Sequence, residues 1–207
     1  MANYCYTEIT ISGEEDEIRL LNDEMEKAFE EGKNQGGRSD QWLGYLMLHI
    51  GYSVDNLPVS CRGSVCYHEL SEDGTSLFIE TETDWSPMLQ VFLLFIQKYA
   101  PEAELIYTAE EPGCDLFCTN DPAHEEYMLM LYVDDDELPE ALQGFDGTDN
   151  CIYAKDLKEI LFQLYPEEKD LQTKEDKTKE LIKRFNSKQY GIAWIYEYQY
   201  VPASECA

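Results

Sequence analysis

The fold follows from the alternating stretch YCYTEITIS at residues 4–12. Side chains along a β-strand point to its two faces in turn, so this alternation predicts a strand with one buried face. The expected buried face carries Cys5, Thr7, Ile9 and Ile11, and the expected exposed face carries Tyr4, Tyr6, Glu8 and Thr10. Ser12 is then a predicted N-cap, because apolar residues recur at helical spacing from Ile18 to Phe29. We therefore expect a half-buried strand followed by an amphipathic helix.

Helices and strands continue to alternate as far as residue 119. A short helix is expected over 40–50, strands over 65–70 and 77–83, a helix over 88–99, and strands over 104–108 and 115–119. Ser86 and Pro87 are expected to start the helix at 88–99, with Trp85 sealing the core beside them. Apart from the extra short helix and the last strand, this is the βαββαβ order of the ferredoxin-like arrangement. We therefore predict an α+β fold in which residues 1–120 form an antiparallel sheet with helices on one face.

Residues 121–207 are predicted to extend this core with more α+β structure. Strands are expected over 127–133 and 190–201, and helices over 155–165 and 174–186. The strand at 190–201 is rich in aromatic residues, which indicates a packed cross-strand ladder more than a platform for stacking bases. Because the stretch at 127–133 is apolar on both faces, it needs neighbours on both sides. We therefore expect the extension to pack on the core as one continuous structure.

Acidic residues dominate the composition. The chain has 43 Asp and Glu against 15 Lys and Arg, a formal net charge of −28, and residues 1–150 hold 33 of these acids but only six of the bases. Such a surface repels nucleic-acid phosphate and anionic lipid, so direct binding of nucleic acid or membrane is not expected. It attracts cations or a basic patch on another protein. We therefore predict a protein partner, which could carry a basic surface. The alternative is that the negative charge serves only solubility.

The cysteines and the apolar segments indicate a cytoplasmic protein. No apolar run approaches the roughly 20 residues that a membrane helix needs, and residues 1–12 lack the basic and apolar regions of a signal peptide. The seven cysteines are odd in number and irregular in spacing. Free thiols in a reducing compartment are therefore expected.

Two short motifs carry soft metal ligands. They are Cys61-x4-Cys66-x-His68 and Cys114-x3-Cys118, which together could supply ligands for zinc. The x3 spacing does not suit a zinc knuckle, and Cys66 and His68 are expected on the same face of one strand. The alternative is that all five are ordinary residues of a reduced protein. We accordingly predict no cofactor and keep these five as candidates only.

Other polar clusters are less specific. The acidic segments 134–137 and 146–150 lack the spacing of an EF-hand loop. Glu110 and Glu111 lie beside Cys114 in the sequence, but nothing distinguishes an acid from a base there. A Cys/His nucleophile pair would have to use His49, His68 or His124, the three histidines of the chain. No phosphate-binding, dinucleotide-binding or hydrolase motif is present, so the catalytic residues stay unknown.

Three segments together resemble a known family. They are residues 1–13, which contain MANYC and ITISG, residues 83–87, which read TDWSP, and residues 110–114, which read EEPGC. This combination is similar to the YubB-type ferredoxin-like family, small proteins of plasmids, phages and gut bacteria with no established activity. The resemblance covers residues 1–120 and implies the ferredoxin-like fold but no reaction. The family pattern has W-S-P-P, and Met88 replaces its second proline here.

Three functional hypotheses follow. The first is a non-enzymatic, acidic protein-interaction module, in keeping with a mobile-element origin and with a fold that hosts many functions. The second is a nucleic-acid decoy whose carboxylates occupy the phosphate sites of a basic nucleic-acid-binding protein. The third is a metal- or thiol-dependent enzyme built around Cys66, His68, Cys114 and Cys118.

Overall fold

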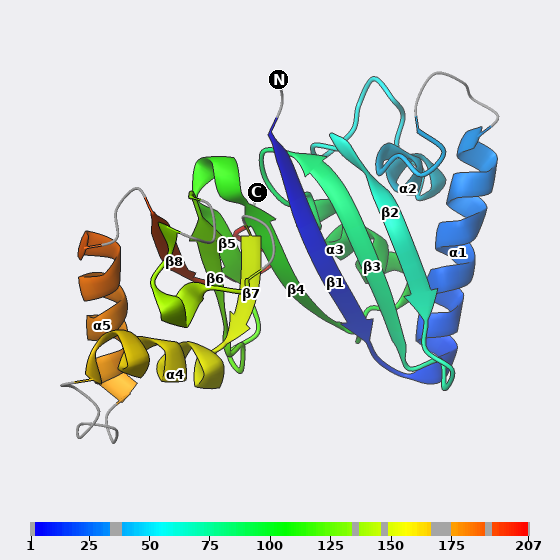
Figure 1. Cartoon of the computed structure of the whole chain (residues 1–207). Helices are drawn as coiled ribbons and strands as arrows, with labels where there is room; N and C mark the ends of the chain where they lie inside the picture. Colours follow the sequence, from blue (N-terminus) through cyan, green and yellow to red (C-terminus); the bar gives the residue numbers. More distant parts are fainter. Residues whose placement is uncertain are drawn as a thin grey trace. The chain divides into compact units, whose positions relative to one another are not determined.

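The structure is a computed structural model that describes residues 3–33, 39–133, 137–145, 149–166, 175–188 and 192–206. Over these residues the chain is an α+β protein with five α-helices and two sheets (Figure 1). It divides into two compact units: unit 1 is Met1–Pro122 with Gln199–Ala207, and unit 2 is Ala123–Tyr198. Residues 199–207 thus belong to the same unit as the N-terminal segment, because their strand pairs with a strand of that segment. None of the described helices has the length and apolar character that crossing a membrane requires.

Unit 1 is built on a six-stranded sheet with the order β2-β3-β1-β4-β5-β9. Its strands are β1 (Tyr4–Ser12), β2 (Gly63–Leu70), β3 (Ser76–Asp84), β4 (Glu104–Glu111), β5 (Leu116–Thr119) and β9 (Gln199–Tyr200). Neighbouring strands are antiparallel except β5 and β9, which are parallel. A short 3-10 turn, η1 (Pro112–Cys114), connects β4 to β5. The predicted alternation of β1 is confirmed, with Cys5, Thr7, Ile9 and Ile11 buried.

Three helices cover one face of this sheet: α1 (Glu15–Lys33), α2 (Gly44–His49) and α3 (Leu89–Tyr99) (Figure 1). Their apolar side chains form one core with the inward-pointing residues of the strands. The predicted helix starts need correction. Ser12 is the last residue of β1, so α1 begins with the acidic turn Glu15–Glu17, whose charges suit the helix dipole. Ser86 lies in a turn before α3, where its N–H bonds the Asp84 carbonyl at 2.9 Å.

Unit 2 has its own three-stranded antiparallel sheet, in the order β7-β6-β8, and its own core. Its elements are β6 (Glu126–Leu131), η3 (Glu140–Leu142), β7 (Asp149–Tyr153), α4 (Ala154–Leu164), α5 (Glu175–Lys188) and β8 (Ala193–Glu197). The long strand expected over 190–201 is wrong, because β8 pairs with β6 whereas β9 pairs with β5. The chain therefore changes sheets at Tyr198.

An ion-paired carboxylate in unit 1 gives a pH-dependent stability. Glu24 of α1 accepts hydrogen bonds from Lys27 Nζ at 2.5 Å and from His49 Nε2 of α2 at 2.9 Å. These bonds, the one from Lys27 first, lower the pKa of Glu24 from its ordinary value of 4.5 to about 2. Because the folded pKa is depressed, the stabilisation is present above pH 4.5 and is lost as the pH falls toward 2.

We therefore expect Glu24→Gln to lower the urea midpoint at pH 6, with the difference from wild type shrinking between pH 4.5 and 2. Urea unfolding followed by circular dichroism at five pH values measures this. A difference that stayed constant down to pH 2 would show that Glu24 stabilises unit 1 by packing and not by charge.

Candidate functional site

The five residues considered as zinc ligands lie in two well-separated groups. Cys66 and His68 are in β2 and Cys61 is just before it, while Cys114 is in η1 and Cys118 in β5. Strands β3, β1 and β4 separate β2 from β5, and at about 4.8 Å per strand the two groups are on the order of 19 Å apart. Zinc ligands must all lie about 2.0–2.3 Å from one ion. The structure therefore does not combine the two motifs into one site.

Within the first group, a β-bulge separates the thiol from the imidazole. The pairing of β2 with β3 shifts between Val65 and Tyr67, which makes Cys66 the extra residue. A bulge of one residue reverses the alternation that follows it. Cys66 is therefore exposed, whereas His68 turns toward the helices, with its ring 6.3 Å from that of Phe29. The expectation that Cys66 and His68 share one face is wrong for this reason.

The remaining polar candidates are, where the structure describes them, placed apart from one another. Across the described ranges, no group of three or more His, Cys, Asp or Glu is placed to hold a metal ion. Residues 134–136 and 146–148, the centres of the two acidic segments, lie outside those ranges. His49 contacts carboxylates of α1, and His124 packs edge-on against the Tyr198 ring at 4.5 Å. Glu111 is buried whereas Glu110 is partly exposed, so the two neighbouring carboxylates face different environments.

The corner after β3 is more open than the sequence suggests. Trp85 has φ 71° and its side chain is 45% exposed, so the expectation that it seals the core is wrong. The left-handed backbone turns the indole outward, and the Trp85 N–H bonds the Asn3 carbonyl at 3.1 Å. The tryptophan that does fill the core is Trp42, which is buried before α2.

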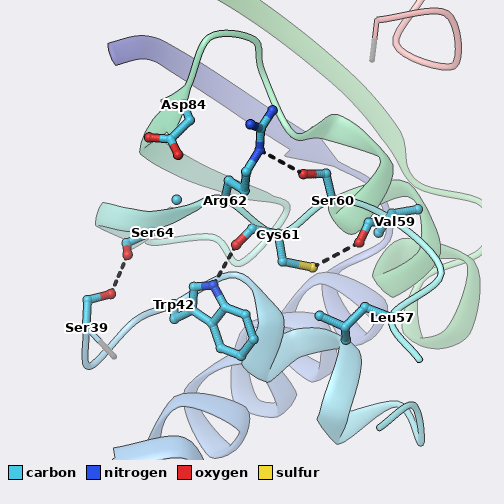
Figure 2. Close-up of a pocket in the computed structure, with 10 residues that line it drawn as sticks. Ser39, Trp42, Leu57, Val59, Ser60, Cys61, Arg62, Ser64 and Asp84 are labelled. Carbon is cyan, nitrogen blue, oxygen red and sulfur yellow. Dashed lines mark hydrogen bonds between the residues drawn. The ribbon is translucent and has the colours of Figure 1, made fainter. Parts of the chain in front are cut away.

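An open pocket of about 600 Å³ lies between the loop before α2, the segment before β2 and the end of β3 (Figure 2). The described residues that line it are Ser39, Trp42, Leu57, Val59, Ser60, Cys61, Arg62, Gly63, Ser64 and Asp84. Trp42 Nε1 donates to the Cys61 carbonyl at 2.5 Å, and Arg62 Nε donates to Ser60 Oγ at 3.3 Å. The Cys61 thiol donates to the Val59 carbonyl at 3.6 Å.

The polar groups of Trp42, Arg62 and Cys61 form hydrogen bonds within the protein. Among the described lining residues of the pocket there is no histidine, and the Cys61 thiol is engaged by a backbone carbonyl. An acyl- or phosphoryl-transfer site needs a nucleophile within hydrogen-bond reach of a base. The described lining residues therefore show no such nucleophile–base pair with a histidine at this pocket.

The face of the unit 1 sheet opposite the helices carries exposed tyrosines and glutamates. We call it the open face and define it by seven outward-pointing residues of β1–β4: Tyr4, Tyr6, Glu8, Tyr67, Glu80, Glu82 and Glu110. The tyrosines are well exposed, Tyr6 by 55%. Figure 1 shows these strands side by side with α3 behind them.

Strand register brings the carboxylates of the open face together. Glu8 is directly opposite Glu80, and Tyr6 has Glu82 as its partner on one side and Glu110 on the other. Side chains at directly opposed positions have Cβ atoms about 4.5–5.5 Å apart. None of the six strands of this sheet contains a Lys or an Arg. Like charges at such positions destabilise a sheet, so the fold carries this arrangement at a cost.

Sequence reasoning did not identify the open face, although the signal is present. Acids occupy every second position from Glu80 to Asp84, in the stretch IETETD that forms the end of β3. Since alternate residues share a face, these three acids must lie on one side of this strand. What the pattern alone could not give is which strands flank β3.

No protein-family model matches the chain, and neither a curated protein nor a solved structure matches it. The open face and the pocket before β2 are therefore the observations on which a function can be based.

Proposed function

We propose that the protein is a non-enzymatic interaction module whose open face binds a basic surface of another protein. The observation that carries this proposal is the set of four glutamates and three exposed tyrosines on strands that contain no Lys or Arg. Carboxylates attract Lys and Arg, and tyrosine rings favour cations over their faces. A local arrangement that opposes the stability of the fold is typical of functional surfaces.

The architecture supports the same proposal. We infer a ferredoxin-like core in unit 1, because β1 and β3 are central, β2 and β4 flank them, and the helices cover one face. Such a sheet leaves its other face available to a partner. The resemblance of residues 1–120 to the YubB-type family agrees with this fold and stays a proposal. The decoy hypothesis is a special case of this proposal, in which the carboxylates of the open face occupy the phosphate sites of a nucleic-acid-binding protein.

The test uses a ten-residue arginine peptide as a probe for basic surfaces, with binding followed by fluorescence anisotropy. Glu80→Gln with Glu82→Gln removes two of the four negative charges of the open face, and Asp16→Asn with Asp23→Asn makes the same charge change on exposed positions of α1. We expect the first double variant to weaken binding about tenfold, because two exposed ion pairs contribute up to about 1 kcal/mol each. The control pair should change it less than about threefold.

Equal losses in both double variants would show that net charge and not the open face attracts the peptide, and the proposal would then be rejected. Pull-down from bacterial lysate with a salt gradient then identifies the natural partner. Displacement of that partner by duplex DNA would favour the decoy over other basic partners.

The substitution Glu80→Gln should change the stability of the protein and its affinity for a basic peptide in opposite directions. Glu80 is directly opposite Glu8 in β1, so Glu80→Gln removes a like-charge pair worth about 0.2–1 kcal/mol. We expect its melting temperature to rise by about 1–3 °C, while its affinity for the arginine peptide falls. Differential scanning calorimetry measures the first effect. A variant with lower stability and unchanged affinity would contradict the role given to Glu80.

A further inference from the structure

Two thiols from distant parts of the chain meet in the core of unit 1. Cys118 is in β5 and Cys206 lies in the segment after β9, and their Sγ atoms are 3.8 Å apart. Both side chains are buried, with exposed fractions of 5% and 8%. Neither is disulfide-bonded. A disulfide needs an Sγ–Sγ distance of about 2.05 Å, so a shift of less than about 2 Å would bring the two atoms to bonding distance.

Several hydrogen bonds hold the segment that carries Cys206 in this position. The Val201 N–H donates to the Thr119 carbonyl at 2.8 Å, and Tyr107 Oη donates to the Val201 carbonyl at 2.8 Å. Gln90 Nε2 of α3 donates to the Ser204 carbonyl at 2.9 Å. Pairing of β9 with β5 fixes the start of the segment. The fold therefore holds the segment that carries Cys206 against the strand that carries Cys118.

The contact also makes the two sulfur atoms unequal. The hydrogen bond from Cys118 lowers the pKa of Cys206, and the same bond, together with burial, raises the pKa of Cys118. The Tyr107 hydroxyl, which donates to the Val201 carbonyl, also lowers the pKa of Cys206, so a thiolate is favoured at Cys206 and not at Cys118. The thiolate is the reactive form of cysteine. Cys206 is thus the nucleophile of the pair and Cys118 the second thiol.

We propose that Cys118 and Cys206 form a redox-active dithiol that a peroxide converts into an intramolecular disulfide. The Cys206 thiolate attacks one oxygen of hydrogen peroxide, the O–O bond breaks, and the departing hydroxide takes a proton to become water. Cys118 then attacks the sulfenic sulfur of Cys206, which forms the S–S bond and releases a second water. Together, the two thiols lose two electrons and two protons, and one peroxide becomes two waters.

Three of the other cysteines, Cys5, Cys66 and Cys114, do not offer the same chemistry. Cys66 and Cys114 are exposed, and the Asn3 amide contacts the Cys114 sulfur at 3.8 Å. Cys5 is fully buried, and desolvation raises the pKa of its thiol to about 11. Oxidation of an exposed thiol should give a sulfenic acid or a mixed disulfide instead of an internal crosslink. The product at Cys118 and Cys206 is therefore distinguishable from general oxidation.

The test is peptide mapping of the full chain after treatment with hydrogen peroxide, with thiols blocked by iodoacetamide under denaturing conditions. We expect peptides containing Cys118 and Cys206 to be recovered as one crosslinked species that a thiol reductant separates. The crosslink closes a loop of about 90 residues, so the oxidised protein should melt about 5–10 °C higher than the reduced protein. Cys206→Ser should abolish both effects, and Cys114→Ser, the matched control at an exposed thiol, should leave both intact.

Peptide mapping of the wild-type chain needs no variant and decides the matter even if Cys206→Ser folds poorly. Recovery of Cys118 and Cys206 as separate alkylated peptides, at a peroxide dose that oxidises Cys66, would overturn the proposal. So would conversion of Cys206 to a sulfinic acid without a crosslink, because that outcome means that Cys118 cannot reach the sulfenic sulfur.

Discussion

Phe185→Ala is expected to destabilise unit 2 by about 3–5 kcal/mol, the usual cost of emptying a buried phenylalanine site. Phe185 is 0% exposed and belongs to the unit 2 core, which contains 15 buried residues among those that the structure describes. The next residue, Asn186, joins α5 to β8 by two hydrogen bonds. Its Nδ2 donates to the Ile195 carbonyl at 2.8 Å, and its Oδ1 accepts from the Ile195 N–H at 2.9 Å. Losing the ring should therefore loosen both the core and the attachment of the helix.

Hydrogen exchange of the amides in β6 and β8 measures this loss. Phe185→Leu keeps most of the volume and should cost less than about 1.5 kcal/mol, while Lys183→Ala, at an exposed position of the same helix, should stay within about 0.5 kcal/mol. If Phe185→Ala cost no more than the lysine control, the core assigned to unit 2 would not be its source of stability.

Trp42→Ala should have a comparable effect in unit 1, about 3–5 kcal/mol. The Trp42 ring is buried below the pocket of Figure 2, and it packs edge-on against Tyr45 at 5.3 Å between ring centroids. It also fills the space beside Gly44, where a Cβ would overlap the indole. The indole N–H anchors the Cys61 carbonyl at 2.5 Å. Truncation therefore removes a packing centre and a support of the pocket wall together.

Two variants separate these contributions in urea unfolding. Trp42→Phe keeps most of the packing but loses the hydrogen bond to Cys61, so we expect a loss of about 1–2 kcal/mol. Trp85→Ala removes the same side chain from an exposed position and should cost less than about 0.5 kcal/mol. A larger loss at Trp85 than at Trp42 would reverse the assignment of the core tryptophan.

Local patterns predicted much of unit 1. The alternation in β1 follows from side-chain periodicity and is observed. The strands expected over 65–70 and 77–83 are also observed, as the antiparallel pair β2 and β3. The exposed position of Trp85 did not follow, because it depends on a left-handed backbone that no pattern encodes. The stretch 190–201 reads as one aromatic strand, yet its two halves pair with different sheets. Such pairings depend on partners far away in the sequence.

The candidate sites also combine features that local sequence patterns predict with features that depend on residues far apart in the chain. Spacing suggested that Cys61, Cys66 and His68 could act with Cys114 and Cys118, but strand order places the two groups at separate parts of the sheet. The thiol that actually meets Cys118 is Cys206, which is 88 residues away and carries no motif. Charge was more informative, because the alternation of acids in β3 is enough by itself to mark one face of that strand.

The insertion of unit 2 between β5 and β9 has a consequence for synthesis on the ribosome. The strand that pairs with β5 follows it by 80 residues, from Thr119 to Gln199. At about 5–20 residues per second, the nascent chain waits roughly 4–16 s for this strand. Through that interval the β5 edge has unpaired backbone groups of the kind that recruit other chains, and Cys118 has no partner thiol. A nascent-chain chaperone or rapid folding of unit 2 would be most valuable within this window.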